Sequence, residues 1–131
     1  MRLLVCGGRD FNNRQAVFSV LYDFEETSEG VSCIIHGGAK GADAWAAEWA
    51  KTNGIDVQEF PADWEKYARS AGPIRNAVML KEGQPDAVLA FPGGRGTADM
   101  IGQARAAGVD VYVVRVKTSP DLAPSDWVVE T

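Results

Sequence analysis

The chain has 131 residues, a formal net charge of −5 and 46% hydrophobic residues. This length suits one domain with a buried core, and the composition is that of an ordinary globular protein. The acidic balance argues against a protein that grips nucleic acid through a broad basic face, and no apolar run is long enough to span a membrane. A small phosphorylated ligand is compatible with this charge. Salt screens charges beyond about 8 Å, so the charged side chains near a site decide whether an anion binds there.

The N-terminal stretch and the cysteines bear on the cellular compartment. Residues 1–7 contain too short an apolar run for a signal peptide and predict a first strand. Cys6 and Cys33 fall on predicted buried strands and lack the spacing of metal ligands. We therefore expect two free core thiols rather than a disulfide, in a cytoplasmic protein. No cofactor is expected to be required, and the sequence leaves the role of a divalent metal open.

Strands and helices are expected to alternate along the chain. Strands are predicted over residues 2–6, 31–36, 55–60, 86–91 and 109–116. Helices are predicted after a cap at Asn12 or Asn13, and over residues 42–53, 74–82 and 97–107. Short turns between such elements give a parallel sheet wound by right-handed crossovers. We therefore predict an α/β fold, a single Rossmann-like doubly wound parallel sheet of about five strands with helices on both faces.

The stretch between the third and fourth strands is the hardest to assign. Residues 63–69 suit a short helix, which Gly72-Pro73 is expected to end before the next helix begins. Trp64 and Tyr67 in this stretch are candidates to close over the base of a ligand. Packing of this aromatic pair at the edge of the core is the slightly favoured interpretation.

The remaining features concern the limits of the core. Residues 1–131 are expected to form a single domain, with its core over about 1–116 and an irregular tail over 117–131. Trp127-Val128-Val129 is a candidate for a further short strand in that tail. Trp45 and Trp49, four residues apart on the second predicted helix, are interpreted as packing against the sheet.

Three loops that leave the carboxyl ends of predicted strands begin with a Gly-Gly pair: Gly7-Gly8, Gly37-Gly38 and Gly93-Gly94. Ligands of open parallel sheets bind beyond these strand ends, where the strand order reverses. A glycine-rich turn before a helix leaves backbone N–H groups free at the positive end of the helix dipole, which favours an anion such as phosphate. Tight turns that bind nothing are the alternative, but the opposite-end connections carry ordinary turn residues instead.

Other known motifs are absent from these loops. None matches the Gly-x-Gly-x-x-Gly dinucleotide fingerprint or a P-loop ending in Gly-Lys-Ser/Thr, so neither a nicotinamide dehydrogenase nor an NTPase follows. No Ser–His–Asp or Cys–His arrangement stands out. The lone His36 lies at a strand end, where contact with a ligand and fixation by backbone hydrogen bonds are both open. The cations near the loops are Arg9, Lys40, Arg75 and Arg95.

The stretch Pro92-Gly93-Gly94-Arg95-Gly96-Thr97, with Arg75-Asn76-Ala77-Val78-Met79 one helix earlier, resembles the SLOG superfamily. That group includes the "lonely guy" phosphoribohydrolases, whose pattern is an Arg-Lys-x-x-Met helix followed by Pro-Gly-Gly-x-Gly-Thr-x-x-Glu. Residues 7–11 and 36–43 make the chain similar to the YspA-related branch. The resemblance extends to about Val116. It implies a Rossmann-like fold, a nucleotide-type ligand and, by analogy alone, a homodimer.

The chain departs from the phosphoribohydrolase pattern at two positions. The essential arginine of those enzymes corresponds to Arg75, but their motif glutamate corresponds to Met100, which cannot act as an acid or base. Asp99 lies one residue earlier, about 100° away around a helix, and is an imperfect substitute. Asn76 also replaces the lysine of the pattern.

The favoured hypothesis is a binding module that senses or sequesters a nucleotide or nucleotide-derived ligand. Residues 93–97 would hold a phosphate through backbone N–H groups, and Arg95 or Arg75 would add charge-assisted hydrogen bonds. Asp10 or Asp43 would accept from ribose hydroxyls. The residues expected to contact the ligand are Gly7, Gly8, Arg9, Asp10, His36, Gly37, Gly38, Lys40, Gly41, Asp43, Arg75, Asn76, Pro92, Gly93, Gly94, Arg95, Gly96 and Thr97.

The alternative hypothesis is an enzyme that cleaves the N-glycosidic bond of a nucleoside monophosphate or related nucleotide. Arg75 would then hold the phosphate, and Asp99 would stabilise the positively charged sugar or orient a water. The structural interpretation of Asp99 and Asp43 is an acid in a first helical turn, favoured by the helix dipole. Asp10 could equally be a turn or capping residue.

Overall fold

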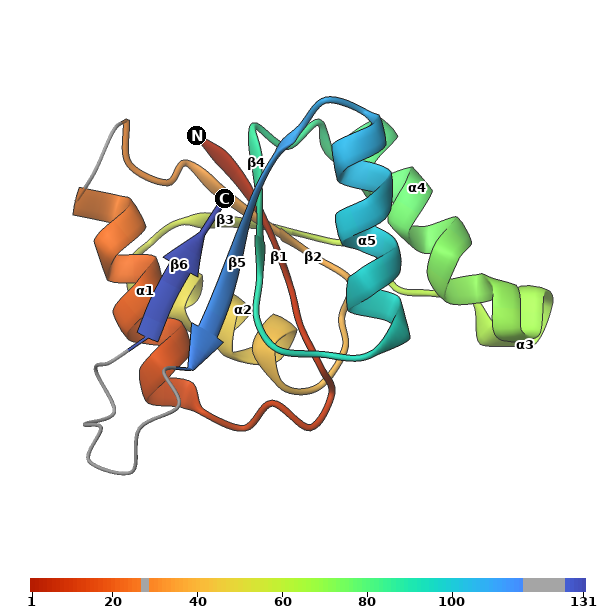
Figure 1. Cartoon of the computed structure of the whole chain (residues 1–131), viewed down its shortest axis with the longest axis horizontal. Helices are drawn as coiled ribbons and strands as arrows, with labels where there is room; N and C mark the ends of the chain where they lie inside the picture. The colour runs from red at the N-terminus through yellow and green to blue at the C-terminus, as the bar shows by residue number, and fades with distance from the viewer. Residues whose placement is uncertain (27–28, 117–126) are drawn as a thin grey trace.

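A computed structural model describes residues 1–26, 29–116 and 127–131 (Figure 1). Its six-stranded sheet has the order β3-β2-β1-β4-β5-β6. The strands are β1 (Arg2–Cys6), β2 (Cys33–His36), β3 (Asp56–Glu59), β4 (Ala87–Ala90), β5 (Asp110–Val116) and β6 (Trp127–Glu130). The helices are α1 (Arg14–Glu26), α2 (Ala42–Thr52), α3 (Trp64–Tyr67), the 3₁₀ turn η1 (Ala68–Ser70), α4 (Ala71–Gly83) and α5 (Arg95–Ala106). The predicted α/β fold is confirmed.

The sheet contains one strand more than the approximate count from sequence. Strands β1 to β5 pair in parallel, whereas β6 pairs antiparallel with β5, placing Val113 opposite Glu130. The candidate strand at Trp127-Val128-Val129 is therefore confirmed, and this part of the tail is not irregular. Parallel pairing needs a crossover of a dozen or more residues, and the link from 117 to 126 is shorter than that. The expectation of an irregular tail over 117–126 lies outside the described residues.

Helices cover both faces of the sheet, with α1 and α2 on one side and α4 and α5 on the other (Figure 1). Successive side chains of a strand point to opposite faces. Leu3 and Val5 accordingly join the core beneath α1 and α2, whereas Leu4 joins the core beneath α4 and α5. Both faces are apolar at the centre of the sheet, which explains why β1, β2 and β4 read as largely hydrophobic runs, whereas the edge strand β3 is exposed.

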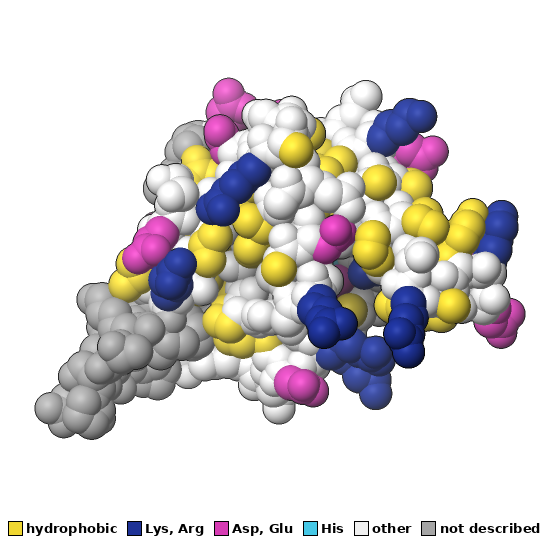
Figure 2. All heavy atoms as spheres, turned by 45° about the vertical axis from the view of Figure 1, so that its right-hand side comes forward, with side chains coloured by type: hydrophobic (Ala, Val, Ile, Leu, Met, Phe, Trp, Pro, Cys, Tyr) yellow, Lys and Arg dark blue, Asp and Glu magenta, His cyan; other side chains and the backbone are white. Residues whose placement is uncertain are grey.

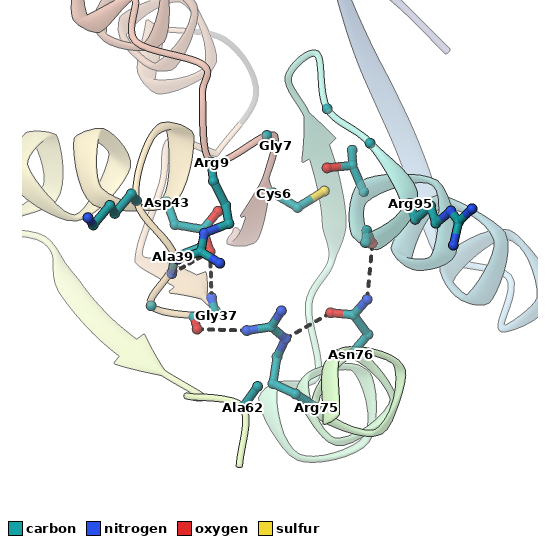
Figure 3. Close-up of a pocket in the computed structure, with 18 of the residues that line it drawn as sticks. Cys6, Gly7, Arg9, Gly37, Ala39, Asp43, Ala62, Arg75, Asn76 and Arg95 are labelled. Carbon is teal, nitrogen blue, oxygen red and sulfur yellow. Dashed lines mark hydrogen bonds between the residues drawn. The ribbon is translucent and has the colours of Figure 1, made fainter. Parts of the chain in front are cut away.

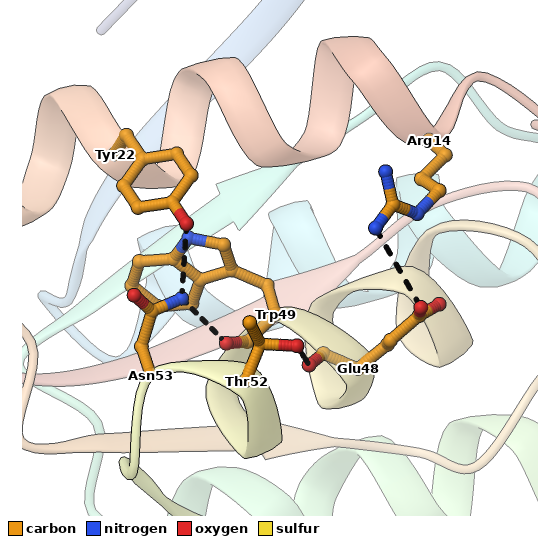
Figure 4. Close-up of polar contacts among 6 residues, drawn as sticks. All are labelled: Arg14, Tyr22, Glu48, Trp49, Thr52 and Asn53. Atoms are coloured by element: carbon orange, nitrogen blue, oxygen red, sulfur yellow. Dashed lines mark hydrogen bonds and ion pairs between the residues drawn. The ribbon is translucent and has the colours of Figure 1, made fainter.

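Helices α1 and α2 are joined by polar contacts above a shared core (Figure 4). Arg14 Nη2 of α1 lies 3.7 Å from Glu48 Oε1 of α2. Trp49 is fully buried, with its ring edge-on to Tyr22 at a centroid distance of 5.6 Å. Trp45 is half-buried against the same core. The predicted packing role is therefore confirmed for both residues. Trp49 is fully buried, whereas Trp45 is partly buried.

The starts of two helices differ from the prediction by two or more residues. Helix α4 begins at Ala71, so Gly72-Pro73 lies in its first turn and does not separate two helices. The first N–H groups of a helix have no intrahelical partner, so the missing N–H of Pro73 costs nothing there. Helix α5 begins at Arg95, two residues before the predicted start at Thr97. The glycine-rich motif therefore supplies the first turn of the helix itself.

Both cysteines are buried free thiols, as expected. They lie on neighbouring strands, but Cys33 pairs with Arg2. Cys6 is four positions further along β1, a separation of about 13 Å at the rise of a strand. This distance excludes a disulfide, which requires Cα atoms within about 7 Å. Among the described residues, no helix combines the length and apolar character needed to cross a membrane.

Candidate functional site

A cavity of about 940 Å³ lies beyond the carboxyl ends of β1, β2 and β4 (Figure 3). Strands β1 and β4 are neighbours in the sheet, yet β1 leads to α1 on one face and β4 leads to α5 on the other. Their loops therefore diverge, and this divergence opens the crevice at which ligands of open α/β sheets bind. All three Gly-Gly loops line the cavity.

Most of the residues predicted to contact a ligand meet at this cavity. Those that line it are Gly7, Gly8, Arg9, Asp10, Gly37, Gly38, Lys40, Asp43, Arg75, Asn76, Pro92, Gly93, Gly94, Arg95, Gly96 and Thr97. His36, Gly41 and Asp99 are not part of its lining. The lining residues that the sequence did not single out are Cys6, Phe11, Ala39, Pro61, Ala62, Gly72 and Met79. Their small or apolar side chains do not indicate a ligand contact in the sequence. Cys6 and Ala39 directly adjoin Gly-Gly pairs, and this position is the one sign that could have indicated them.

Arg75 spans the floor of the cavity. Its Nη1 donates to the carbonyl oxygen of Gly37 at 2.7 Å, and its Nε donates to Asn76 Oδ1 at 3.0 Å. Nη2 has no hydrogen-bond partner in the part of the chain that the structure describes. Figure 3 shows the guanidinium held between the β2 loop and Asn76, whereas the Arg95 side chain points away along α5. Partial burial lowers the pKa of Arg75, and the Asp43 carboxylate opposes that shift.

Asn76 connects Arg75 to the start of α5. Only 2% of Asn76 is exposed, and its Nδ2 donates to the carbonyl oxygen of Gly96 at 3.1 Å and to Asp99 Oδ2 at 2.9 Å. Gln103 Nε2 donates to the same Asp99 oxygen at 2.7 Å. Asp99 therefore braces α4 against α5. Met100, at the position of the family glutamate, is fully buried in the core beneath α5.

Asp43 and His36 both fix the β2 loop, residues 37–41. Asp43 Oδ2 accepts from the N–H groups of Gly37 at 3.0 Å and Ala39 at 3.4 Å. Burial raises the pKa of Asp43 to about 6, with these two hydrogen bonds opposing the shift. His36 Nδ1 accepts from the Gly38 N–H at 3.0 Å, and burial lowers the pKa of the imidazole. Of the two interpretations left open for His36, the structure thus shows fixation by the backbone.

Several loop glycines permit the loops to pack against one another. The Gly8 N–H donates to the carbonyl oxygen of Pro92 at 2.9 Å. A Cβ added to Gly93 would lie 2.6 Å from the Gly8 nitrogen. Gly41 has φ +79°, and a Cβ there would collide with the carbonyl oxygen of Gly8. Side chains at these positions would force the loops apart, so the fold itself requires glycine.

The first turn of α5 is different. No backbone N–H from Gly93 to Thr97 has a hydrogen-bond acceptor among the described residues, and the first bond of the helix is Ala98 N–H to the Gly94 carbonyl at 3.0 Å. A Cβ added to Gly94 or Gly96 would meet nothing within 4 Å. This turn therefore presents bare amides to the cavity, at the positive end of the helix dipole.

The charge of the cavity is opposite to that of the whole chain. Its lining contains four cations but two carboxylates, within a chain of net charge −5. The cations are Arg9, Lys40, Arg75 and Arg95, and the carboxylates are Asp10 and Asp43. Figure 2 shows basic side chains gathered along the lower edge of the face that it presents. The local field therefore favours an anion, because more distant charges are screened.

Trp64 lines the cavity and is 56% exposed. Its Cη2 packs over Gly72 in the first turn of α4, where an added Cβ would be 3.6 Å away. Packing at the edge of the core, the slightly favoured interpretation, is therefore wrong for Trp64. Tyr67 does not line the cavity, and Lys66 Nζ lies 5.1 Å from its ring centroid. No cluster of three or more His, Cys, Asp or Glu able to hold a metal ion occurs within the described residues.

Comparison with known proteins places the chain in a family. A model of the YspA, cpYpsA-related SLOG family matches residues 1–67. The Gene 61 protein of Mycobacterium phage D29 is 38% identical over 117 residues, which cover 84% of this chain and 93% of the phage protein. This chain belongs to the YspA, cpYpsA-related SLOG family. The resemblance noted in the glycine-rich motifs is thus confirmed.

Solved structures support the fold of this SLOG chain. DNA processing protein A (DprA) of Streptococcus pneumoniae superposes with a TM-score of 0.70 at 19% identity, over 95% of this chain and 53% of that structure. Glycinamide ribonucleotide transformylase 1 of Symbiobacterium toebii gives a TM-score of 0.56 at 17% identity, over 92% of this chain and 54% of that structure. The SLOG chain spans about half the length of each. At these identities the likeness shows the Rossmann-like fold alone.

Proposed function

We propose that this SLOG chain binds a nucleotide or nucleotide-derived phosphorylated ligand in the cavity beyond β1, β2 and β4, as a sensor or sequestering module. The observation that carries the proposal is the open first turn of α5. Its N–H groups from Gly93 to Thr97 have no acceptor among the described residues and border a cavity lined by cations. Several convergent amides at a helix N-terminus form a site for phosphate.

The glycine at position 96 supports the same conclusion. Glycine inside a helix costs about 0.5–1 kcal/mol relative to alanine. Gly96 lies in the first turn of α5, has no positive φ, and has nothing within 4 Å of the place where a Cβ would be. The protein itself therefore does not require glycine there. A ligand that approaches the backbone closely does require it.

Arg75 is the side chain best placed to add charge to the phosphate site. Two of its nitrogens are held by Gly37 and Asn76, which fixes the guanidinium while Nη2 stays available. A preorganised arginine loses little side-chain entropy on binding. Its charge-assisted hydrogen bond would contribute about 1.5–3 kcal/mol. Arg95 contributes its backbone N–H instead, because its side chain points away (Figure 3).

Trp64 supplies a surface for the base. Its exposed side chain lines the cavity, as do the neighbouring Pro61 and Ala62. Stacking of a base on an aromatic ring contributes about 1–3 kcal/mol. Trp64→Ala should therefore weaken nucleotide binding at least fivefold, while the free energy of unfolding changes little because the ring is mostly exposed.

Isothermal titration calorimetry tests the phosphate site with nucleoside 5′-monophosphates and the corresponding nucleosides. We expect the monophosphates to bind at least tenfold more tightly. Gly96→Ala should weaken this binding at least tenfold and raise the free energy of unfolding by up to about 1 kcal/mol. Gly102→Ala is the matched control, because Gly102 lies in the same helix, has nothing within 4 Å and does not line the cavity. Unchanged binding by Gly96→Ala, or no binding of any monophosphate, would contradict the proposal.

The hydrolytic alternative has less support from the geometry. Asp99 Oδ2 is engaged by Asn76 and Gln103, and Asp99 is not part of the cavity lining. Incubation of the protein with nucleoside monophosphates, followed by chromatography for free base, distinguishes the two hypotheses. Release of base that Asp99→Asn abolishes would favour the enzyme. The homodimer implied by the resemblance stays a prediction, which sedimentation equilibrium would test.

A further inference from the structure

A second, smaller hollow of about 310 Å³ adjoins the main cavity. Arg9 and Lys40 line both hollows, so these two cations form the boundary between them. Asn12, Trp45 and Glu48 lie on the far side of that boundary. The nucleotide site proposed above does not use this second space, which is itself large enough for a small molecular group.

The two boundary cations lack partners among the residues that the structure describes. Arg9 and Lys40 are exposed, and neither forms an ion pair or hydrogen bond with another described residue. Glu48 contributes a carboxylate to the lining of the second hollow, and its Oε1 lies 3.7 Å from Arg14 Nη2. Two unpaired cations on one wall repel each other, and an anion between them would relieve that repulsion.

The far wall of the second hollow has an aromatic surface. One side of Trp45 packs against the core beneath α1 and α2, and the residue also lines the hollow. The half-buried indole is thereby held in place, so stacking on it costs little ordering of the side chain. Asn12, also in the lining, offers both a donor and an acceptor. An aromatic face, an amide and adjacent cations are the groups that recognise a nucleoside joined to a phosphate.

We propose that the ligand is a dinucleotide, in which two nucleosides are joined through phosphate. The first nucleotide occupies the main cavity with its phosphate on the first turn of α5. The connecting phosphate lies against Arg9 and Lys40, and the second nucleoside stacks on Trp45. This inference rests on the proposed function, because it extends the same site into the second hollow.

Calorimetry tests the dinucleotide inference by comparing three probes: a nucleoside 5′-monophosphate, a 5′–5′ pyrophosphate-linked dinucleotide and a 5′-phosphorylated 3′–5′ linked dinucleotide. At least one dinucleotide should bind at least tenfold more tightly than the monophosphate. Trp45→Ala should abolish that advantage, since stacking contributes about 1–3 kcal/mol, and should leave the monophosphate Kd within twofold. Trp45→Phe should retain part of the advantage. The monophosphate Kd also reports whether each variant is folded, which matters because Trp45 contacts the core.

The outcomes separate this inference from the proposed function. Trp64→Ala should weaken the monophosphate and the dinucleotide by the same factor, because Trp64 lines the main cavity and does not line the second hollow. Equal affinity of wild type for monophosphate and both dinucleotides would overturn the dinucleotide inference and leave the proposed function standing. A dinucleotide advantage that survives Trp45→Ala would also overturn it. Failure of every probe to bind would contradict both.

Discussion

Gly37-Gly38 opens the β2 loop, and Gly93-Gly94 leads into the first turn of α5. The two regions differ in their free hydrogen-bonding groups. In the β2 loop, the N–H groups of Gly37, Gly38 and Ala39 are taken by Asp43 and His36. In the first turn of α5, the N–H groups from residue 93 to residue 97 have no acceptor among the described residues. Both regions border one cavity, but the three amides that follow β2 are occupied, whereas the five from residue 93 to residue 97 are open to an anion.

The difference also holds for the glycines themselves. Gly41 allows the β2 loop to pack on the β1 loop, and its positive φ suits glycine. Gly94 and Gly96 border open space. Glycine is thus needed for packing in the first region and, on our proposal, for access of a ligand in the second. Substitutions should therefore affect stability in the β2 loop and binding in the first turn of α5.

The largest expected effect is that of Gly41→Ala. The new Cβ would collide with the carbonyl oxygen of Gly8, and the positive φ of Gly41 is strained for alanine. These two effects together should lower the free energy of unfolding by about 3–4 kcal/mol. Gly54→Ala is the control, because Gly54 has φ +68° but nothing within 4 Å. It should cost only about 1 kcal/mol in urea unfolding, and equal losses for both variants would show that loop packing contributes little.

The next largest effect is expected for Asn76, which connects Arg75 of α4 to the first turn of α5. Asn76→Ala removes the hydrogen bonds to Arg75, Gly96 and Asp99 from a buried position. We expect a loss of about 2–3 kcal/mol in the free energy of unfolding, because buried polar groups are left without partners. Monophosphate binding should weaken as well, since Arg75 loses one of its two anchors. Gln103→Ala, which removes a partner of Asp99 but not of Arg75, should leave that binding nearly unchanged.

A pH dependence should follow from the carboxylate that fixes the β2 loop. Burial raises the pKa of Asp43 from 3.8 to about 6, so between these values the folded chain holds a proton that the unfolded chain releases. The stabilising contribution is complete below pH 3.8 and is lost as the pH rises through 6. Asp43→Asn cannot titrate there, yet it retains an oxygen for Gly37 and Ala39. The variant should therefore gain about 2 kcal/mol relative to wild type between pH 4 and pH 7.

Urea unfolding of both proteins at several pH values measures this gain. The lowered pKa of His36 acts in the opposite direction, because its contribution is present above pH 6.5 and is lost as the pH falls below that value. It is common to both proteins, so it cancels in their difference. A difference that stays constant from pH 4 to pH 7 would contradict the assignment of the raised pKa to Asp43.

The smallest expected effect is that of Asp99→Asn. The new side chain keeps an oxygen that can accept from Asn76 and Gln103, so the free energy of unfolding should fall by less than about 1 kcal/mol. The monophosphate Kd should stay within twofold of wild type, because Asp99 does not line the cavity. Calorimetry that shows a tenfold loss would place Asp99 in the binding site after all.

Part of the candidate site was predictable from local patterns. The central strands gave short hydrophobic runs and the helices gave helical periodicity, and right-handed crossovers place the carboxyl ends of parallel strands at one edge. The three Gly-Gly loops therefore had to lie at the same edge of the sheet. The helix starts were less predictable, because Pro73 and Gly96 usually interrupt helices, and only their first-turn positions make them harmless.

The sequence by itself determined the wound α/β sheet and the edge at which its glycine-rich loops lie, since both follow from local periodicity and chain handedness. Tertiary structure alone decided that the amides of Gly8, Gly37 and Gly38 are occupied while, within the described residues, those from residue 93 to residue 97 stay free. The Gly8 N–H is taken by the carbonyl oxygen of the distant Pro92, and Arg75 holds the β2 loop through the Gly37 carbonyl oxygen, while Asp43 and His36 take the amides of that loop. It also decided that Asp99 braces two helices while Met100 enters the core. Such pairings depend on how packed elements meet in space, which no local pattern encodes.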